Sequence, residues 1–172
     1  MYVSALQEPR PLERRDDRSR FQSGNSEIDD WFHRFAWQNH RAGNARVFVT
    51  TQEPETLGFY ALSMGAVQRS TLPDALKPGQ RPEPCPVLLL ARLAVDQRAQ
   101  GRGIGAALLK DALLRAYKLS NEVGFAALLV HCANDQAREF YLSQSSHFVP
   151  CPGAENHLML PLRAMREFID AL

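Results

Sequence analysis

The alternation of apolar and polar positions predicts a mixed α/β chain built on one central sheet. Residues 46–51 and 57–66 are two apolar runs on either side of Glu53-Pro54-Glu55, a pattern typical of a hairpin. Further strands are expected at 88–95, at 125–130, near 158–160, and once within residues 1–20. Strands and helices follow one another without an internal repeat, which favours a compact α/β fold over a repeat architecture.

Helical spacing and capping signals predict four helical regions. The first begins at Asn25-Ser26, an N-cap followed by acidic residues that suit the positive end of a helix dipole, and it ends at Gly43-Asn44. Its apolar face, which is expected to pack in the core, comprises Ile28, Trp31, Phe32, Phe35 and Ala36. The second helical region follows the glycine-rich turn at 101–105, and the third begins near Asn134. The fourth contains the C-terminal apolar positions Leu162, Met165, Phe168, Ile169 and Leu172.

Length and composition indicate one domain over residues 1–172. A hydrophobic content of 45% and a charged content of 23% are ordinary for a soluble globular protein. The net charge of +1 excludes a chain that binds nucleic acid over its whole surface. The proline-rich stretch at 70–86 is expected to be a long ordered loop or a mobile lid within that domain.

Cysteine usage and the absence of a long apolar run predict a cytoplasmic location. The three cysteines, Cys85, Cys132 and Cys151, have no metal-ligand spacing and resemble reduced thiols, with Cys132 expected in the core. No run approaches the length of a membrane span, and the N-terminal segment is charged rather than apolar. No metal is therefore expected.

The most informative segment joins an apolar strand to a helix through a glycine-rich turn. Gly101, Gly103 and Gly105 remove side chains where a ligand must approach the backbone closely. The N–H groups at the start of the following helix are unpaired donors at the positive end of its dipole. This arrangement is typical of a pyrophosphate-binding site.

Three phosphate-binding patterns compete for this turn. A P-loop needs Lys and Ser or Thr after its last glycine, and this chain has Ala106-Ala107 instead. A dinucleotide fingerprint is formally met, but a long segment precedes it and the next strand ends in His131-Cys132 rather than an acidic residue. The third pattern, Q/R-x-x-G-x-G/A, is met by Gln100, Gly103 and Gly105.

Together with the block from Asn134 to Tyr141, which reads N-x-x-A-x-x-F-Y, this pattern resembles the GNAT superfamily of acetyl-CoA-dependent N-acetyltransferases. The resemblance implies a GNAT fold, with a central, mostly antiparallel sheet flanked by helices, and acetyl-CoA as co-substrate. It also implies that Tyr141 is the general acid that protonates the departing CoA sulfur, with a packing aromatic beside Phe140 as the alternative. Cofactor contacts are implied for Leu93, Ala94 and Val95 with pantetheine amides, for Gln100, Gly101, Arg102, Gly103, Ile104 and Gly105 with pyrophosphate, and for Asn134 with the pantetheine arm.

Further blocks at 21–24, 28–32, 58–63 and 90–95 are similar to the GNAT toxins of bacterial toxin–antitoxin modules. Those toxins acetylate the α-amino group of aminoacyl-tRNA and block translation. The resemblance implies an aminoacyl-tRNA substrate, a cognate ribbon-helix-helix antitoxin and a homodimer. The chain departs from the family pattern after Tyr141, where the connection to Phe148 is about two residues longer and His147 replaces the usual glycine.

The residues themselves favour an α-amino acceptor. Such a group has a pKa of about 7.7–8.0, so it is partly neutral at cellular pH, whereas a lysine amine near 10.4 needs a strong base. The strand at 88–95 offers no Glu, Asp or His as that base. A small-molecule amine, a protein N-terminus and a non-catalytic CoA-binding role remain alternatives.

Recognition of tRNA requires a local basic patch. The candidates are Arg34, Arg41, Arg69, Arg81, Arg92 and Arg138, each of which has a solvated surface position as its alternative. Arg92 is expected nearest the acceptor, with a structural ion pair as an equal alternative. His131 is expected to be a satisfied core histidine, and His33, His40 and His157 to be surface or packing residues.

Overall fold

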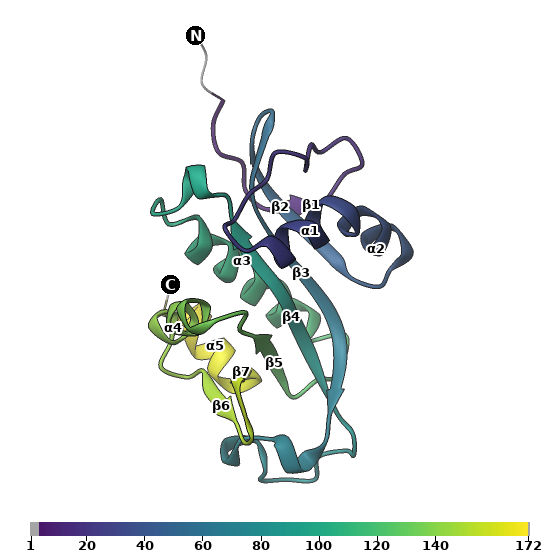
Figure 1. The fold of residues 1–172 in the computed structure, drawn as a ribbon. Coiled ribbons are helices and arrows are strands. Elements are labelled where there is room, and N and C mark those ends of the chain that lie inside the picture. Colours follow the sequence, from purple (N-terminus) through teal and green to yellow (C-terminus); the bar gives the residue numbers. More distant parts are fainter. Residues whose placement is uncertain (1–3, 172) are drawn as a thin grey trace. The chain divides into compact units, whose positions relative to one another are not determined.

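The computed structural model describes residues 4–171. Seven strands within this range form one sheet in the order β1-β2-β3-β4-β5-β7-β6 (Figure 1). Strand β4 pairs with β5 in parallel, whereas β1–β2, β2–β3, β5–β7 and β6–β7 are antiparallel. The predicted mixed α/β fold with a mostly antiparallel sheet is therefore confirmed.

The chain divides into two compact units. Unit 1 contains residues 4–63 and 92–111, and unit 2 contains residues 64–91 and 112–171. Strands β3 and β4 and helix α3 each run from one unit into the other. A single domain over residues 1–172 stays a prediction.

Unit 1 is built around an apolar cluster between two helices and the strands of its own part of the sheet. Its elements are β1 (Arg10–Pro11), α1 (Ser26–Arg34), α2 (Ala36–Ala42), β2 (Arg46–Gln52), the first part of β3 (Glu55–Val67), the end of β4 (Cys85–Val95), the 3₁₀ turn η3 (Gln97–Ala99) and the start of α3 (Ile104–Leu119). Phe32 of α1 stacks on Phe59 of β3, with ring centroids 4.0 Å apart. The fully buried aromatic rings at this contact fix α1 to the sheet.

Local capping explains both ends of the first helical region. The Asn25 side chain accepts hydrogen bonds from the backbone amides of Glu27 and Ile28, as the sequence predicts. The region ends at Gly43, whose φ of 79° lies in the left-handed range that favours glycine. The hairpin of β2 and β3 follows, turning at residues 53 and 54 as expected.

The predicted apolar face of this region is wrong at one position. Phe35 interrupts the helix with φ −120° and separates α1 from α2. This break turns its side chain away from the core, and Phe35 is 38% exposed, while Phe32 and Ala36 are buried as expected. Ile28 and Trp31 pack against the cluster while remaining partly exposed.

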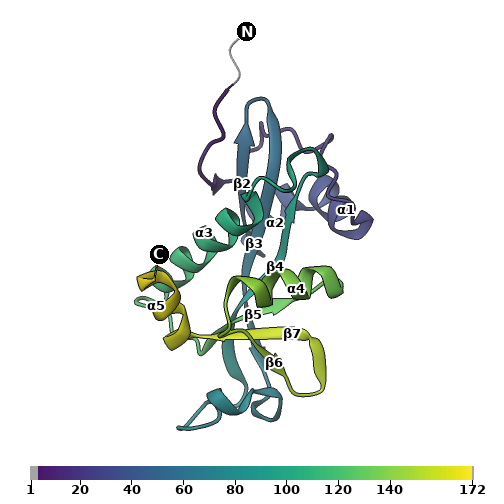
Figure 2. The same ribbon diagram turned by 90° about the vertical axis from the view of Figure 1, so that its left-hand side faces the viewer.

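Unit 2 contains the rest of the sheet and the two C-terminal helices. Its elements are the end of β3, the 3₁₀ turns η1 (Arg69–Thr71) and η2 (Asp74–Leu76), the first part of β4, the end of α3, β5 (Ala127–His131), α4 (Asp135–Gln144), β6 (Val149–Cys151), β7 (Ala154–Pro161) and α5 (Leu162–Asp170). Helices α4 and α5 both contact β7 (Figure 2).

Two leucines of the proline-rich stretch pack in the core of unit 2. Leu72 and Leu76 are each 1% exposed and pack in one apolar cluster with Val87, Leu129 and Met159. Because both leucines are buried, the structure favours the ordered loop over the mobile lid. Strand β4 begins at Cys85, inside the segment expected to be loop.

Other boundaries differ modestly from the predictions. Strand β5 is shifted by one to two residues, β7 is longer than expected, and the three-residue β6 was not predicted. Helix α5 confirms the C-terminal amphipathic helix, but Leu172 lies outside the described residues. The three cysteines are free and buried, as expected for Cys132. Within residues 4–171, no helix has the length and apolar character needed to cross a membrane.

Candidate functional site

A buried carboxylate holds the turn that precedes the glycines. Asp96, 1% exposed, accepts hydrogen bonds from the amide of Gln22 at 3.0 Å and the amide of Arg98 at 2.9 Å. The guanidinium of Arg98 adds bonds of 2.8 and 3.0 Å. Burial alone would raise the pKa of Asp96, but these bonds outweigh it and lower the pKa below its ordinary value. Asp96 was missed from the sequence, although Asp at a strand end with Arg two residues later is a turn signal.

Gln100 fastens the same turn to the segment before α1. Its side-chain amide donates to the carbonyl of Ser23 at 2.9 Å and to the carbonyl of Val95 at 3.0 Å. The amide of Gln97 also donates to the carbonyl of Gln22 at 2.8 Å. The side chain of Gln100 therefore shapes the turn, and its predicted contact with pyrophosphate stays a prediction.

Backbone conformation accounts for two of the glycines. Gly101 and Gly103 have φ of 81° and 80°, and a Cβ at either position would meet no atom within 4 Å. Glycine is required here because the chain enters the left-handed region, not because the protein is crowded. Within the part of the chain that the structure describes, the backbone amides of 101–106 have no hydrogen-bond acceptor. These successive free donors fit an anion-binding turn, and their contact with pyrophosphate stays a prediction.

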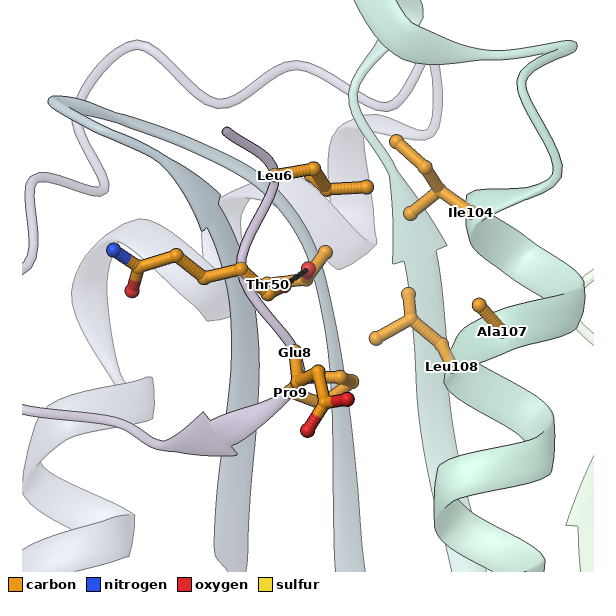
Figure 3. Close-up of a pocket in the computed structure, with 8 residues that line it drawn as sticks. Leu6, Glu8, Pro9, Thr50, Ile104, Ala107 and Leu108 are labelled. Carbon is orange, nitrogen blue, oxygen red and sulfur yellow. Dashed lines mark hydrogen bonds between the residues drawn. The ribbon is translucent and has the colours of Figure 1, made fainter. Parts of the chain in front are cut away.

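The start of α3 packs closely against β3. A Cβ at Gly58 would come within 2.9 Å of Leu108 and 3.2 Å of Ile104, so only glycine allows this approach. An apolar pocket of about 180 Å³ adjoins the same turn of helix (Figure 3). Ile104 and Leu108 point into it, and the lining contains no Lys or Arg to attract a phosphate. This lining favours the turn over the pocket as the predicted pyrophosphate site.

The residues predicted to contact pantetheine lie at the end of β4 and at the N-cap of α4. Leu93, Ala94 and Val95 are the last residues of β4, three positions beyond the ladder with β5 that covers Leu88–Leu90. Asn134 is the N-cap of α4, and its side-chain oxygen accepts from the amide of Ala137 at 2.8 Å. Its side-chain NH₂ has no acceptor among residues 4–171.

Tyr141, the predicted general acid, is a buried phenol in unit 2. Its side chain is 4% exposed, and its ring contacts Phe140 and Phe148 with centroid distances of 5.2 and 5.8 Å. Its hydroxyl has no hydrogen-bond partner in the described range. Burial, with a smaller contribution from Cys132, raises the pKa of Tyr141 above its ordinary value. The phenol therefore keeps its proton at physiological pH, and its role as general acid stays a prediction.

Arg92 forms a stacking contact instead of the ion pair considered from the sequence. Its guanidinium lies 4.1 Å from the ring centroid of Trp31, and Trp31 stacks on Phe59 at 6.2 Å. No carboxylate forms a salt bridge with Arg92 within residues 4–171. Partial burial lowers the pKa of Arg92, and the guanidinium keeps its hydrogen-bond donors for an external acceptor.

The remaining candidate arginines are distributed over both units. In unit 1, Arg34 pairs with Asp30 at 3.4 Å and Arg41 is exposed. In unit 2, the partners are Glu83 for Arg69, the carbonyl of Leu76 for Arg81 and the carbonyl of Glu155 for Arg138. Their role in binding tRNA stays a prediction.

The structure corrects the prediction for His131 and shows a partner for His147 that the sequence did not predict. His131 is exposed, so its assignment as a core histidine is wrong, and it stacks on His157 with ring centroids 4.0 Å apart. His147, in the longer connection after Tyr141, lies 3.3 Å from Glu167 of α5. It lines a pocket of about 530 Å³ in unit 2 together with Arg81 and Arg163. The longer connection between Tyr141 and Phe148 therefore brings His147 next to α5.

Comparisons with known proteins agree with this architecture. The acetyltransferase (GNAT) domain family matches residues 43–144. A tRNA-acetylating toxin of Mycobacterium tuberculosis (strain ATCC 25618 / H37Rv) is 39% identical over 167 residues, covering 97% of this chain and 99% of the relative. A structure of AtaT complexed with acetyl-methionyl-tRNAfMet covers 95% of this chain and 98% of its own, with TM-score 0.85 and 28% identity. A mutant AtaT bound to the C-terminus of the antitoxin AtaR and acetyl-CoA covers 97% and 99%, with TM-score 0.80 and 26% identity.

Proposed function

The chain belongs to the GNAT acetyltransferase family, and from this premise we propose that it acetylates the α-amino group of an aminoacyl-tRNA and so blocks translation as a toxin. The observation that carries the proposal is the likeness to the tRNA-acetylating toxin, which extends over almost the full length of both chains. The local geometry of each unit supports the chemistry that this activity needs.

The turn at 101–106 fits the diphosphate of acetyl-CoA, because it presents free amides at the start of a helix. Arg102 adds an exposed guanidinium within the turn. Asp96 and Gln100 act as positioning residues, since they hold the turn through backbone groups and touch no ligand in this role. A turn that is already shaped loses little conformational freedom on binding.

Acetyl-CoA supplies the acyl group as an activated thioester. The backbone of Leu93, Ala94 and Val95 would pair with the pantetheine amides as an added strand does, and the free NH₂ of Asn134 would donate to the same arm. The unpartnered hydroxyl of Tyr141 would donate its proton to the departing thiolate. Its raised pKa keeps this proton in place until the sulfur departs.

The acceptor amine needs little activation if it is an α-amino group. With a pKa of about 7.7–8.0, a sizeable fraction is neutral and nucleophilic at cellular pH. This agrees with residues 88–95 of β4, where no Glu, Asp or His provides a strong base. A lysine side chain is a poorer substrate for the same reason.

Arginines on both units would bind the tRNA backbone, with Arg34, Arg41, Arg81 and Arg92 as the candidates. Arg92 is the most informative, because stacking on Trp31 fixes its guanidinium while leaving it without a carboxylate. We further propose a homodimer, a cognate ribbon-helix-helix antitoxin, and action in the cytoplasm, where charged tRNA is used. An antitoxin is supported by the AtaT structure that contains the C-terminus of AtaR.

The alternative is acetylation of a small-molecule amine or a protein N-terminus. The decisive assay incubates the protein with radiolabelled acetyl-CoA and, separately, charged tRNA, deacylated tRNA, free amino acids and a peptide. Label is expected only in charged tRNA, on the amino acid, and mass spectrometry of the released acyl-amino acid gives its identity. Label in the peptide or free amines but never in charged tRNA would refute the toxin proposal, and no label from any acceptor would favour a CoA-binding module.

A further inference from the structure

A pair of stacked imidazoles stands where β5 ends. His131, the last residue of β5, lies directly opposite His157 of β7 in the antiparallel ladder. Their ring centroids are 4.0 Å apart and the ring planes differ by 13°. His131 is exposed and His157 is half-buried, so the pair presents aromatic surface to solvent from a rigid sheet.

Strand alternation places this pair at the edge of an apolar face. His131 shares its side of β5 with Leu129, and His157 shares its side of β7 with Met159. Leu129 and Met159 belong to the buried cluster of unit 2. The histidines therefore continue the same face beyond the cluster, out to the carboxyl end of β5, where it becomes accessible.

The helix that carries Tyr141, α4, begins four residues after this strand end. The ladder continues past β5, because the amide of Cys132 donates to the carbonyl of Asn156 at 2.7 Å. Cys132 therefore faces the side opposite to His131, and α4, which carries Tyr141, contacts β7. The stacked imidazoles therefore lie at the strand end from which the chain continues into the helix of Tyr141.

We propose that the His131–His157 pair is the stacking platform for the terminal unpaired base of the aminoacyl-tRNA, an inference that rests on the proposed function. Proteins bind unpaired nucleotides by stacking their bases on aromatic side chains, histidine included, often from a sheet surface. In aminoacyl-tRNA the reacting amino acid is attached to the ribose of the last nucleotide. A platform beside the reaction centre would therefore position the amine through its neighbouring base.

A binding experiment tests the platform without catalysis. The probe is an uncharged acceptor-stem hairpin whose terminal base is 2-aminopurine, which loses fluorescence on stacking. Wild-type protein is expected to quench it, and His131→Ala and His157→Ala to bind it roughly 5- to 100-fold more weakly with less quenching. His131→Phe and His157→Phe retain an aromatic face, so binding within about threefold of wild type is expected. Alanine variants that quench like wild type would overturn the platform.

Steady-state kinetics separate stacking from other roles. In His131→Ala the KM for charged tRNA is expected to rise by a similar factor, with the KM for acetyl-CoA unchanged. The matched control is His147→Ala, which removes an exposed histidine paired with Glu167 and is expected to leave both constants unchanged. If His131→Phe instead lowers kcat without raising the KM for tRNA, the imidazole acts in proton transfer and the stacking role is refuted. Circular dichroism confirms that each variant is folded.

The two proposals fail in distinguishable ways. Wild-type protein that quenches the hairpin but acetylates no charged tRNA would refute the proposed activity and leave the platform as a nucleic-acid site. Wild-type protein that acetylates charged tRNA, with alanine variants equal to it in both assays, would refute the platform alone.

Discussion

Replacing Asp96 by Asn tests whether the buried carboxylate holds the turn that precedes Gly101. The substitution keeps the shape but removes the charge that accepts bonds from Gln22 and Arg98, and it points an NH₂ group at existing donors. Removing one partner of a fully buried pair costs about 3–5 kcal/mol. Because the side chain of Arg98 is 42% exposed and can be solvated, about 2–3 kcal/mol is expected here. For a chain of this size that lowers Tm by roughly 4–12 °C.

Urea unfolding of wild type and Asp96→Asn at several pH values measures this effect. The hydrogen bonds lower the folded-state pKa of Asp96, so their stabilisation is present above the unfolded-state pKa of about 3.9. The difference in unfolding free energy is therefore expected to be full at pH 7 and to shrink below about pH 4. Asp74→Asn is the matched control, an exposed carboxylate at a 3₁₀ turn that should change stability by less than about 0.5 kcal/mol. Equal losses in the two variants, or none in Asp96→Asn, would refute the reasoning.

Tyr141→Phe should lower the transfer rate roughly 10²- to 10⁴-fold while calorimetry shows unchanged acetyl-CoA affinity. Because burial raises the pKa of Tyr141, the wild-type rate should climb from pH 6.5 to 9 as the amine loses its proton, and a fall near pH 8 would contradict this role. Gly103→Ala should weaken CoA binding about tenfold through strain of about 1–2 kcal/mol, whereas Gly153→Ala, with φ 73°, should lose stability alone. Arg92→Gln should raise the KM for charged tRNA several-fold and reduce the salt slope of binding by about one, and an unchanged slope would exclude a phosphate contact.

Local signals were sufficient where one residue determines one conformation. The side-chain oxygen of Asn25 caps the start of the first helical region, and the left-handed φ of Gly43 ends it. Both residue types prefer those positions. Apolar runs of strand length likewise predicted the hairpin of β2 and β3. The glycine turn was recognisable because a helix start with free amides needs little tertiary context.

Tertiary contacts decided what the sequence left open. Phe35 fits the apolar spacing of one helix, but the helix breaks at that residue and exposes its ring. His131 follows the apolar residues of β5 in sequence. On its face of the strand, however, the buried cluster of unit 2 includes Leu129 and does not extend to His131. The strand β6 has three residues, too few for a periodic signal.

In the candidate site, sequence reasoning identified the residues of the turn, Gln100 among them, but missed Asp96 and the hydrogen bonds that hold the turn in place. Asp96 and Gln100 act on Gln22 and Ser23, and no local pattern reveals a hydrogen bond across so long a stretch of chain. For Arg92, the sequence could not distinguish a carboxylate partner from the ring of Trp31, because a contact between residues far apart in the chain leaves no local sequence pattern.

The bonds from Gln100 and Gln97 to the segment just before α1 have a genetic consequence. Ser23 and Gln100 are 77 positions apart, yet they belong to one hydrogen-bonded joint. Selection for loss of coenzyme affinity should therefore recover lesions in two separate stretches of the gene, one around codons 22–24 and one around codons 96–105. Second-site suppressors of a lesion in one stretch should be found in the other.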